Sequence, residues 1–313
     1  MSICSNIKSG VPLLSRHASM KRRSFLRASS MALAGTAGVP PIRAGYRSVE
    51  YAAPTLSLNA YSFNEVLLSG QMSLNRLFRF ASGTGFSAVD LTAYYIPGYP
   101  EVPGDQLLYE IKRNAFRAGV SFSGTGVRND FTVAGGEALA REIDHVKQWI
   151  VAASKLGAPN IRIFDGKAAS TVNLSGAIHQ QVVDAFRECA RFGARYGVNV
   201  AYQNHNDFLI SSREIIDVME RVDSEWFGLM LDTGSVPGPD PYQEIEQLIP
   251  YAVTWQVKEL VRTETGFEPL DIKRLTGILK KYDYRGFLPL ETLGEGDPEL
   301  KVEAFYRNVA GSL

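Results

Sequence analysis

The segment Gly228-Leu229-Met230-Leu231-Asp232-Thr233-Gly234 decides the fold that we expect for this chain. Its apolar residues form a short run that ends in one carboxylate and then in turn residues, which is typical of a buried parallel strand. In a barrel of parallel strands, functional side chains gather at the carboxyl ends of the strands. Asp232 is therefore a candidate site residue, although an aspartate before a turn also has a capping role.

Three further strand-like segments end in polar side chains: Val200-Ala201-Tyr202-Gln203-Asn204-His205, Val253-Thr254-Trp255-Gln256-Val257-Lys258 and Phe287-Leu288-Pro289-Leu290-Glu291. We expect these strand ends to converge with that of Asp232. We predict that Asp232 and Glu291 bind a divalent metal and that Gln203 and Gln256 complete its ligands. Two carboxylates favour hard cations such as Mg²⁺ or Mn²⁺, with Co²⁺ and Zn²⁺ as alternatives. Each glutamine has a second interpretation, as a hydrogen-bonded core amide.

From Leu56 onward, strand-like and helical segments alternate. The strand-like segments are residues 56–63, 88–93, 120–123, 160–164, 198–203, 227–232, 253–258 and 286–291. Alternation of this kind predicts a parallel sheet. Eight units within roughly 260 residues fit a single (β/α)8 TIM barrel over residues 54–313 better than an open doubly wound sheet. No Gly-x-Gly-x-x-Gly follows the first strand, so dinucleotide binding lacks its main signal.

The N-terminal residues differ in charge from the rest of the chain. Residues 1–45 hold seven basic residues and no acidic one, and the remainder holds 26 basic and 33 acidic residues. Lys21-Arg22-Arg23-Ser24-Phe25-Leu26 precedes a mildly apolar stretch with small residues, which resembles a twin-arginine export signal. We therefore expect residues 1–45 to be an export signal and linker, and the mature protein to be periplasmic or extracellular. The alternative is a disordered or amphipathic tail.

Composition excludes or disfavours several other classes of protein. Apolar residues make up 45% of the chain and charged residues 21%, which is ordinary for a globular protein. No run of about 18 apolar residues occurs, so we expect no stable membrane insertion after the signal is removed. The acidic balance of the remainder disfavours nucleic acid as a partner. Cys189 has no second cysteine outside the N-terminal segment, and we expect it to be a buried, small apolar residue.

Two further side chains share a side of their strands with the glutamines. His205 follows Gln203 by two residues, and Lys258 follows Gln256 by two. His205 is a candidate base, substrate contact or metal ligand, with a structural role as the alternative. Lys258 is a candidate for stabilising an oxyanion or an enolate, and its alternative is to reach solvent.

Candidate substrate contacts lie near the ends of the second and fourth strands. Arg162, with Asp165 and Asp90 close to the same strand ends, could bind an anionic or polyhydroxy ligand. Tyr94 and Tyr95 begin an aromatic loop that could wall a sugar pocket, because aromatic faces stack on the apolar faces of sugars. Alternatively, the arginine and the two aspartates pack the barrel or lie at its surface. The alternative for the aromatic loop is that it is a packed surface loop without a ligand.

These residues resemble the sugar phosphate isomerase/epimerase superfamily of xylose-isomerase-like barrels. The resemblance covers Leu56 to Leu313, and its most specific pieces are Tyr202-Gln203-Asn204-His205, Leu231-Asp232-Thr233-Gly234, Trp255-Gln256-Val257-Lys258-Glu259 and Leu290-Glu291. In that superfamily, strands five to eight supply Glu, Asp, His and Glu as metal ligands, and the two glutamates move a proton between sugar carbons. Here Gln203 replaces the first glutamate and Gln256 replaces the histidine.

The resemblance implies a metal-dependent isomerase or epimerase that transfers a proton next to a carbonyl of a small carbohydrate or keto sugar. Because glutamine cannot accept a proton at neutral pH, Glu291 would need His205 or Lys258 as its partner. A lyase or hydratase acting on keto-glycosides and a non-catalytic, exported sugar-binding protein are alternatives, and a homo-oligomer stays open. An endonuclease-like relative needs several zinc-binding histidines, and of the four in the chain only His205 is placed for a site.

Overall fold

The computed structural model describes residues 51–167, 176–205, 207–236 and 238–313. The expected export signal lies outside the described residues, so export and location stay predictions. Within the described residues, no helix combines the length and apolar character that a membrane crossing requires.

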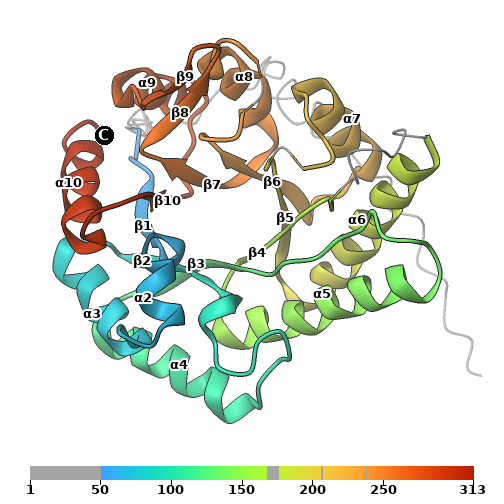
Figure 1. The fold of residues 1–313 in the computed structure, drawn as a ribbon, viewed down its shortest axis with the longest axis horizontal. Helices are drawn as coiled ribbons and strands as arrows, with labels where there is room; N and C mark the ends of the chain where they lie inside the picture. Colours follow the sequence, from blue (N-terminus) through green and yellow to red (C-terminus); the bar gives the residue numbers. More distant parts are fainter. Residues whose placement is uncertain (1–50, 168–175, 206, 237) are drawn as a thin grey trace, which may run out of the picture. The chain divides into compact units, whose positions relative to one another are not determined.

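Eight parallel strands close into a barrel in the order β1-β10-β7-β6-β5-β4-β3-β2 (Figure 1). The strands are β1 (Thr55–Asn59), β2 (Ala88–Thr92), β3 (Ser121–Gly126), β4 (Asn160–Ile163), β5 (Asn199–Gln203), β6 (Phe227–Asp232), β7 (Ala252–Lys258) and β10 (Phe287–Glu291). Each strand pairs with the next barrel strand along the chain, and β10 returns to β1. This confirms the predicted single-domain TIM barrel.

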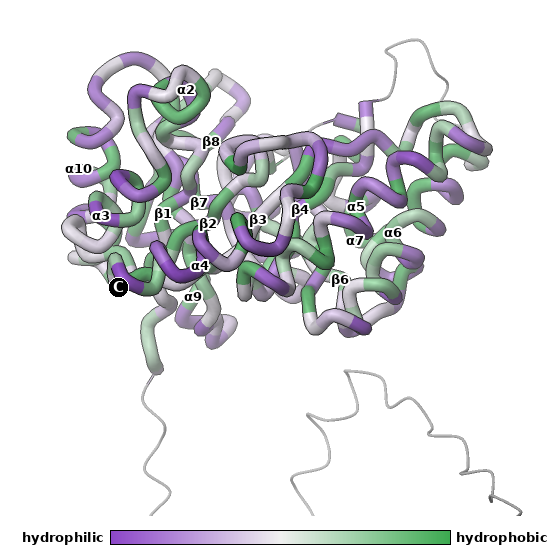
Figure 2. Tube along the Cα trace, turned by 90° about the horizontal axis from the view of Figure 1, so that it is seen from below, coloured by the Kyte–Doolittle hydropathy of each residue, from purple (hydrophilic) through white to green (hydrophobic). Residues whose placement is uncertain are grey.

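Helices surround the barrel in Figure 1: α2 (Asn64–Leu68), α3 (Leu74–Thr84), α4 (Asp105–Ala118), α5 (Glu137–Leu156), α6 (Gly176–Tyr196), α7 (Ser212–Val222), α8 (Pro241–Leu248), α9 (Ile272–Lys281) and α10 (Pro298–Ala310). Short 3₁₀ helices follow β1 and β2 (Ala60–Phe63 and Ala93–Tyr95) and precede β7 (Ile249–Tyr251). Helix α4 buries Leu108, Ile111 and Ala115, whose spacing of three and four residues places them on one face. Figure 2 shows the resulting alternation of hydrophobic and hydrophilic residues along α3, α4 and α6.

The apolar core fills the space between the strands and the helices. Trp149, Trp255 and Tyr202 are among its largest fully buried side chains. Cys189 on α6 is also fully buried, as expected. The strands are buried on both faces. A polar side chain at a strand end is therefore either enclosed by other protein atoms or faces a cavity.

The first predicted strand is longer than the observed one. Residues 56–63 were expected to be extended, but β1 ends at Asn59. The side chain of Asn59 accepts a hydrogen bond from the backbone N–H of Tyr61 at 2.9 Å and caps a 3₁₀ helix there. This turn brings Asn59 and Tyr61 to the carboxyl end of the barrel.

The third predicted strand is shorter than the observed one, because β3 continues through Gly124 and Gly126. Glycine disfavours strands in general, but here both positions lack room for a side chain. A Cβ at Gly124 would lie 2.6 Å from Asp90 Oδ2, and a Cβ at Gly126 would lie 2.8 Å from Arg162 Nε. The two glycines therefore make space for the side chains of β2 and β4.

An antiparallel hairpin after β7 has no counterpart in the predicted elements. It consists of β8 (Leu260–Thr263) and β9 (Gly266–Pro269). Its backbone pairs only with itself, outside the barrel sheet. The hairpin adds an exposed wall next to the carboxyl ends of β7 and β10.

Candidate active site

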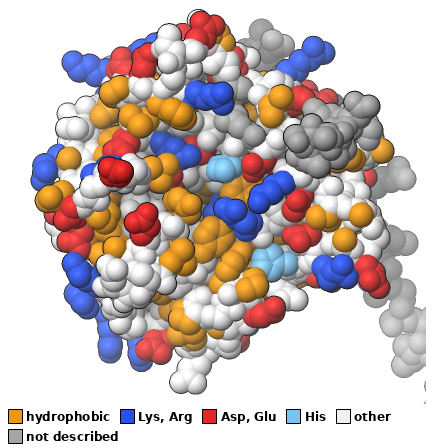
Figure 3. Space-filling view, viewed as in Figure 1, with side chains coloured by type: hydrophobic (Ala, Val, Ile, Leu, Met, Phe, Trp, Pro, Cys, Tyr) orange, Lys and Arg blue, Asp and Glu red, His pale blue; other side chains and the backbone are white. Residues whose placement is uncertain are grey.

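A cavity of about 170 Å³ lies at the carboxyl ends of the barrel strands. Eight of the eleven candidate residues named from the sequence line it: Asp90, Tyr94, Arg162, Gln203, His205, Gln256, Lys258 and Glu291. Figure 3 shows basic side chains and a histidine gathered near the centre of the face in view. The expected convergence of the strand ends is thus present in the structure.

Asp232 lies fully buried directly beside the cavity, at the end of β6. Its Oδ2 accepts hydrogen bonds from Gln203 Nε2 at 2.8 Å, Ser235 Oγ at 3.1 Å and Lys258 Nζ at 2.8 Å. Its Oδ1 accepts from the backbone N–H of Gly234 at 3.0 Å. The turn-capping role is therefore present, and the same carboxylate also binds the side chains of Gln203 and Lys258.

The end of β6 is also tied to the end of β5 through Asn204. Asn204 Nδ2 donates to the carbonyl of Asp232 at 3.0 Å, and its Oδ1 accepts from the Asp232 N–H at 2.9 Å. A paired amide contact of this kind holds two strand ends in one register, which fixes the position of the Asp232 carboxylate.

Glu291 ends β10 and is buried against the cavity. Its Oε2 accepts from Gln256 Nε2 at 2.7 Å, and its Oε1 lies 4.0 Å from Lys258 Nζ. Burial raises the pKa of Glu291 to about 7, although Lys258 and Gln256 oppose the rise. At neutral pH, this carboxyl group can therefore either accept or donate a proton.

Lys258 lies between the two carboxylates, with a side chain only 14% exposed. Burial lowers the pKa of Lys258, but the charges of Asp232 and Glu291 outweigh this effect and raise the pKa above its ordinary value. The side chain therefore remains a cation at neutral pH. It does not extend to solvent, which removes one of the two interpretations that the sequence left open.

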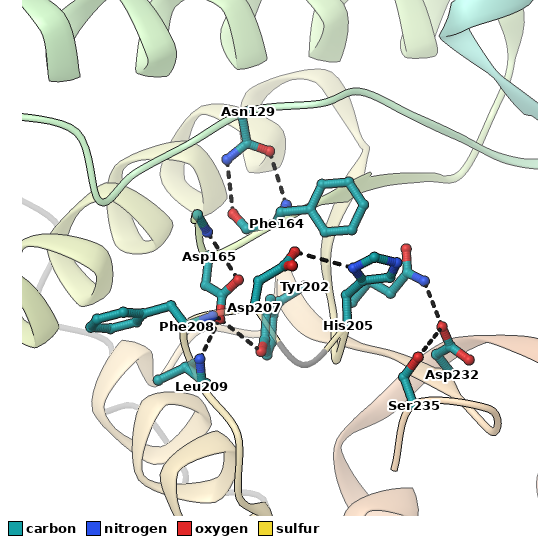
Figure 4. A network of polar contacts seen from close by, with 12 residues as sticks. Asn129, Phe164, Asp165, Tyr202, His205, Asp207, Phe208, Leu209, Asp232 and Ser235 are labelled. Atoms are coloured by element: carbon teal, nitrogen blue, oxygen red, sulfur yellow. Dashed lines mark hydrogen bonds and ion pairs between the residues drawn. The ribbon is translucent and has the colours of Figure 1, made fainter. Parts of the chain in front are cut away.

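His205 belongs to the loop after β5 and lines the cavity with a side chain that is 41% exposed. Its Nδ1 lies 3.2 Å from Asp207 Oδ2, and its ring packs edge-on against Phe164 with centroids 5.2 Å apart. Figure 4 shows the imidazole between Asp207 and the end of β6. A carboxylate on Nδ1 orients the ring and leaves Nε2 as the nitrogen available for proton transfer.

A polar network beneath this loop determines its path (Figure 4). Asp165 Oδ2 accepts from the N–H of Leu209 at 2.7 Å, the N–H of Phe208 at 3.2 Å and the hydroxyl of Tyr202 at 3.2 Å. The side chain of Asn129 pairs with the backbone N–H and carbonyl of Phe164 at 2.9 and 2.8 Å. Asp165 is fully buried and does not line the cavity, so it holds the loops rather than a ligand.

Arg162 supplies a second buried cation to the cavity. Its Nη1 donates to the hydroxyl of Tyr94 at 3.0 Å and to the carbonyl of Val127 at 2.7 Å. Its guanidinium lies 4.3 Å from the centroid of the Phe164 ring. No carboxylate in the described part of the chain forms an ion pair with it. Its charge is therefore free to attract hydroxyl or anionic groups of a ligand.

Tyr94 and Tyr95 have different surroundings. Tyr94 faces the cavity, whereas Tyr95 does not line it and packs in the apolar core. The hydroxyl of Tyr95 donates to Asn64 Oδ1 at 2.9 Å. The predicted substrate contact of Tyr95 is thus not supported by its position, because the 3₁₀ turn over Ala93–Tyr95 directs the neighbouring side chains to different sides.

Asp90 is a buried carboxyl group on β2 that also faces the cavity. Its Oδ2 has no hydrogen-bond partner among the residues that the structure describes. Burial raises the pKa of Asp90 to about 7, opposed by the charge of Arg162. This oxygen is buried against Gly124 of β3, so burial without a hydrogen bond is the main feature of the Asp90 side chain.

Several cavity residues were missed in the sequence: Asn59, Tyr61, Thr92, Arg128, Phe164, Met230 and Leu293. Asn59 is the last residue of β1, and Arg128 lies two residues after the end of β3. The ends of these two strands were predicted four and three residues away, so the position of both residues at the carboxyl end was hidden. The sequence signal that could have identified Arg128 is the Gly-x-Gly pair at the end of β3. It shows that β3 continues to Gly126, two residues before Arg128. Met230 shows that an apolar strand residue can also reach the cavity.

The predicted metal requires lone pairs on both carboxylates and amide oxygens that face the ion. Instead, Gln203 and Gln256 direct their NH₂ groups at the carboxylates, since an amide oxygen there would be repelled. Lys258 occupies the space beside Asp232. Among the described residues, no group of three His, Cys, Asp or Glu side chains is placed to hold a metal ion. This donor set does not fit a divalent ion, and the metal has no role in the mechanism that we propose.

Comparison with known proteins identifies one family model. The model described as xylose isomerase-like TIM barrel matches residues 78–306. No curated protein matches the chain.

Many solved structures share the fold. The probable 3-DHS dehydratase from Bacillus anthracis has a TM-score of 0.68 at 18% identity, covering 82% of this chain and 98% of that one. D-psicose 3-epimerase from Clostridium cellulolyticum has a TM-score of 0.65 at 15% identity, covering 82% and 91%. The 3-keto-D-glucoside 4-epimerase from E. coli has a TM-score of 0.66 at 13% identity, covering 82% and 100%. At these identities, the likeness shows the fold alone.

Proposed function

The chain belongs to the xylose isomerase-like TIM barrel family, and we propose that it is an enzyme that transfers a proton at a carbon next to a carbonyl group of a carbohydrate. The observation that carries this proposal is that the carboxyl group of Glu291 and the ammonium group of Lys258 lie 4.0 Å apart at one cavity. Enolisation needs a base for the carbon-bound proton and a positive charge for the oxygen that becomes negative. The two epimerases that share the fold act on ketose and keto-glucoside substrates by name, which supports this reaction class.

In the proposed first step, ionised Glu291 removes the proton from the carbon next to the carbonyl. The electron pair of the C–H bond forms the C=C bond of an enolate, and the carbonyl electrons move to its oxygen. Lys258 donates a hydrogen bond to that oxygen and stabilises its charge, while Asp232 holds the lysine in place. The raised pKa of Glu291 leaves part of the protein in the ionised form at neutral pH and makes that form a stronger base.

A second group must return the proton on the opposite face if the product is the epimer at the same carbon. The sequence suggested His205 or Lys258 for this role, and the raised pKa of Lys258 argues against the lysine because it makes the ammonium group a weaker acid. In the barrel order, β5 lies three strands from β10, nearly across the barrel, whereas β2 with Asp90 lies two strands away. We therefore assign His205 to proton return on the opposite face, which is epimerisation. If Asp90 instead returns the proton to the neighbouring carbon on the same side, and a second proton moves between the two oxygens, the reaction is isomerisation.

The main alternative within this chemistry is a lyase that acts on keto-glycosides. The observation that favours it is a neighbouring cavity of about 320 Å³, which shares Lys258, Glu291 and Leu293 with the first cavity. The hairpin side chains Leu260 and Phe267 give it apolar walls, and Phe267 is 65% exposed. A sugar with an apolar substituent would match the polar and apolar cavities together. If that substituent is attached one carbon beyond the enolate, the enolate oxygen re-forms the carbonyl, the electron pair of the C=C bond forms a new double bond to that next carbon, and the C–O bond breaks. Glu291, protonated in the first step, gives its proton to the leaving alkoxide, which departs as an alcohol.

The test is proton exchange in D₂O with a panel of ketoses, aldoses and keto-glycosides, followed by NMR. We expect deuterium incorporation at one carbon next to the carbonyl, and a loss of at least roughly 100-fold in the Glu291→Gln protein. A circular dichroism spectrum and a thermal melt check that this variant is folded. Full exchange in a folded Glu291→Gln protein would show that the mechanism is wrong. Binding of a sugar without exchange would favour the non-catalytic sugar-binding protein.

We also propose that the mature enzyme acts outside the cytoplasm, on the strength of the basic and apolar N-terminal segment. Cell fractionation and intact mass of the mature protein test this proposal. A chain that stays in the cytoplasm with its N-terminal segment intact would contradict it.

A further inference from the structure

We infer that the ammonium group of Lys258 is the resident cation of this site and that Asp232 and Glu291 share it in place of a divalent metal. The inference concerns the same cavity as the proposed function. It is nevertheless a statement about ion binding, so it can be tested without a substrate and without turnover.

The position of Lys258 is the first part of the argument. Its Nζ lies 2.8 Å from Asp232 Oδ2 and 4.0 Å from Glu291 Oε1. A divalent ion bound by these carboxylates would lie about 2.0–2.6 Å from their oxygens, closer than the ammonium group does. The ion and the ammonium group would then be near neighbours of like charge in a buried place. The two cations cannot both occupy this place, and the hydrogen bond to Asp232 holds the ammonium group in it.

The hydrogen bonds of Asp232 are the second part. Its Oδ2 already accepts from Gln203, Ser235 and Lys258, and its Oδ1 accepts from a backbone N–H. A carboxylate offers about four lone-pair sites, so little capacity remains for a metal. The carboxylate that would be the central ligand is thus fully engaged by donors of the protein itself.

The two glutamines are the third part, because they match the lysine rather than a metal. Gln203 and Gln256 each donate an N–H to one carboxylate and add no charge. The group of two carboxylates and one ammonium then carries a net charge of about −1 when Glu291 is ionised, with each carboxylate receiving its own amide donor. A glutamate at position 203 would place a third carboxylate against Asp232, and a single ammonium could not balance it. A neutral glutamine at position 203 and the buried cation of Lys258 therefore fit the same balance of charge.

The experiment is a titration of the mature protein with Mn²⁺, followed by calorimetry and by the electron paramagnetic resonance of free Mn²⁺. We expect the wild type to show no stoichiometric binding up to roughly 1 mM Mn²⁺. Lys258→Met removes the cation and keeps a side chain of similar length, so it should bind one Mn²⁺ per chain at least about 10-fold more tightly than the wild type. Asp232→Ala in the Lys258→Met background should abolish this binding.

Binding of one Mn²⁺ per wild-type chain at micromolar concentration, lost in Asp232→Ala, would overturn the inference. So would a folded Lys258→Met protein that binds Mn²⁺ no better than the wild type. If Lys258→Met does not fold, the wild-type titration decides alone. These outcomes are distinct from a failure of the proposed function, which would appear as absent proton exchange whatever the metal content.

Discussion

Gln256 and Glu291, on the neighbouring strands β7 and β10, form a buried hydrogen bond of 2.7 Å between the amide N–H and the carboxyl group. The amide donor stabilises the ionised carboxylate and lowers the pKa of Glu291, against the larger effect of burial. The glutamine therefore controls how much of the proposed base is ionised at neutral pH.

Replacing Gln256 with Met should move the pH dependence of the reaction. In the wild type, the proton-exchange rate should rise as the pH increases through about 7, because Glu291 must be ionised to act as a base. Loss of the donor raises the pKa of Glu291 further, so the midpoint should move up by about one pKa unit. The matched control is Gln203→Met, which removes a donor from Asp232 instead. Equal midpoints in the wild type and Gln256→Met would contradict the assignment of Glu291.

The two candidates for the second proton-transfer group predict different effects of substitution. His205→Asn should leave exchange of the substrate proton with solvent intact, because Glu291 performs it, while epimer formation falls by roughly 100-fold or more. Asp90→Asn should have a smaller effect on epimer formation. Both quantities come from one NMR experiment in D₂O. An unchanged epimerisation rate in His205→Asn would exclude the histidine and favour Asp90 or a water molecule.

Asp90 should also make the stability of the protein depend on pH. Its pKa is about 7 in the folded state and near 3.8 in the unfolded state. Between these values the folded state holds a proton that the unfolded state has lost, so the free energy of unfolding should fall as the pH rises from about 4 to about 7 and then level off. One pKa unit corresponds to roughly 1.4 kcal/mol, so the contribution has an upper limit of about 4 kcal/mol.

Urea denaturation of the wild type and Asp90→Asn across this pH range measures the contribution of Asp90. The asparagine cannot titrate, so the stability of the variant relative to the wild type should increase with pH. Glu291 and Asp165 are present in both proteins, and their contributions cancel in the comparison. Parallel curves for the two proteins would show that Asp90 has an ordinary pKa.

The fold was predictable because its signals are local. Strand β6 has the bounds expected from the sequence, because its apolar run ends at Asp232 and turn residues follow. The third predicted strand, residues 120–123, ended too early because glycines such as Gly124 and Gly126 normally weaken a strand. The reason for these glycines is the space that Asp90 and Arg162 require, and this depends on residues more than 30 positions away in the sequence.

The candidate site was predictable as a set of strand ends but not as a set of contacts. The alternation of strand-like and helical segments and the position of each residue at the end of its strand are enough to predict that Gln203, Asp232, Gln256 and Glu291 lie at one end of a barrel. Whether an amide presents its oxygen or its N–H depends on which group of the neighbouring strand faces it. The direction of Lys258, toward Asp232 rather than toward solvent, is likewise set by a residue 26 positions away.

The hairpin β8–β9 leads to the last prediction, which concerns substrate choice. Phe267 lines the apolar cavity next to Lys258 and Glu291, so it should contact an apolar substituent of a glycoside rather than the sugar. Phe267→Ala should lower kcat/KM for an aryl keto-glycoside by about 5- to 30-fold, corresponding to roughly 1–2 kcal/mol of lost apolar contact. The same change should have little effect on a methyl keto-glycoside or a free keto sugar. Phe116→Ala on α4 is the matched control, because Phe116 is also exposed, at 81%, and lines neither cavity. Equal losses for the aryl and methyl substrates would show that the hairpin does not select the substituent, and the lyase alternative would lose the observation that favours it.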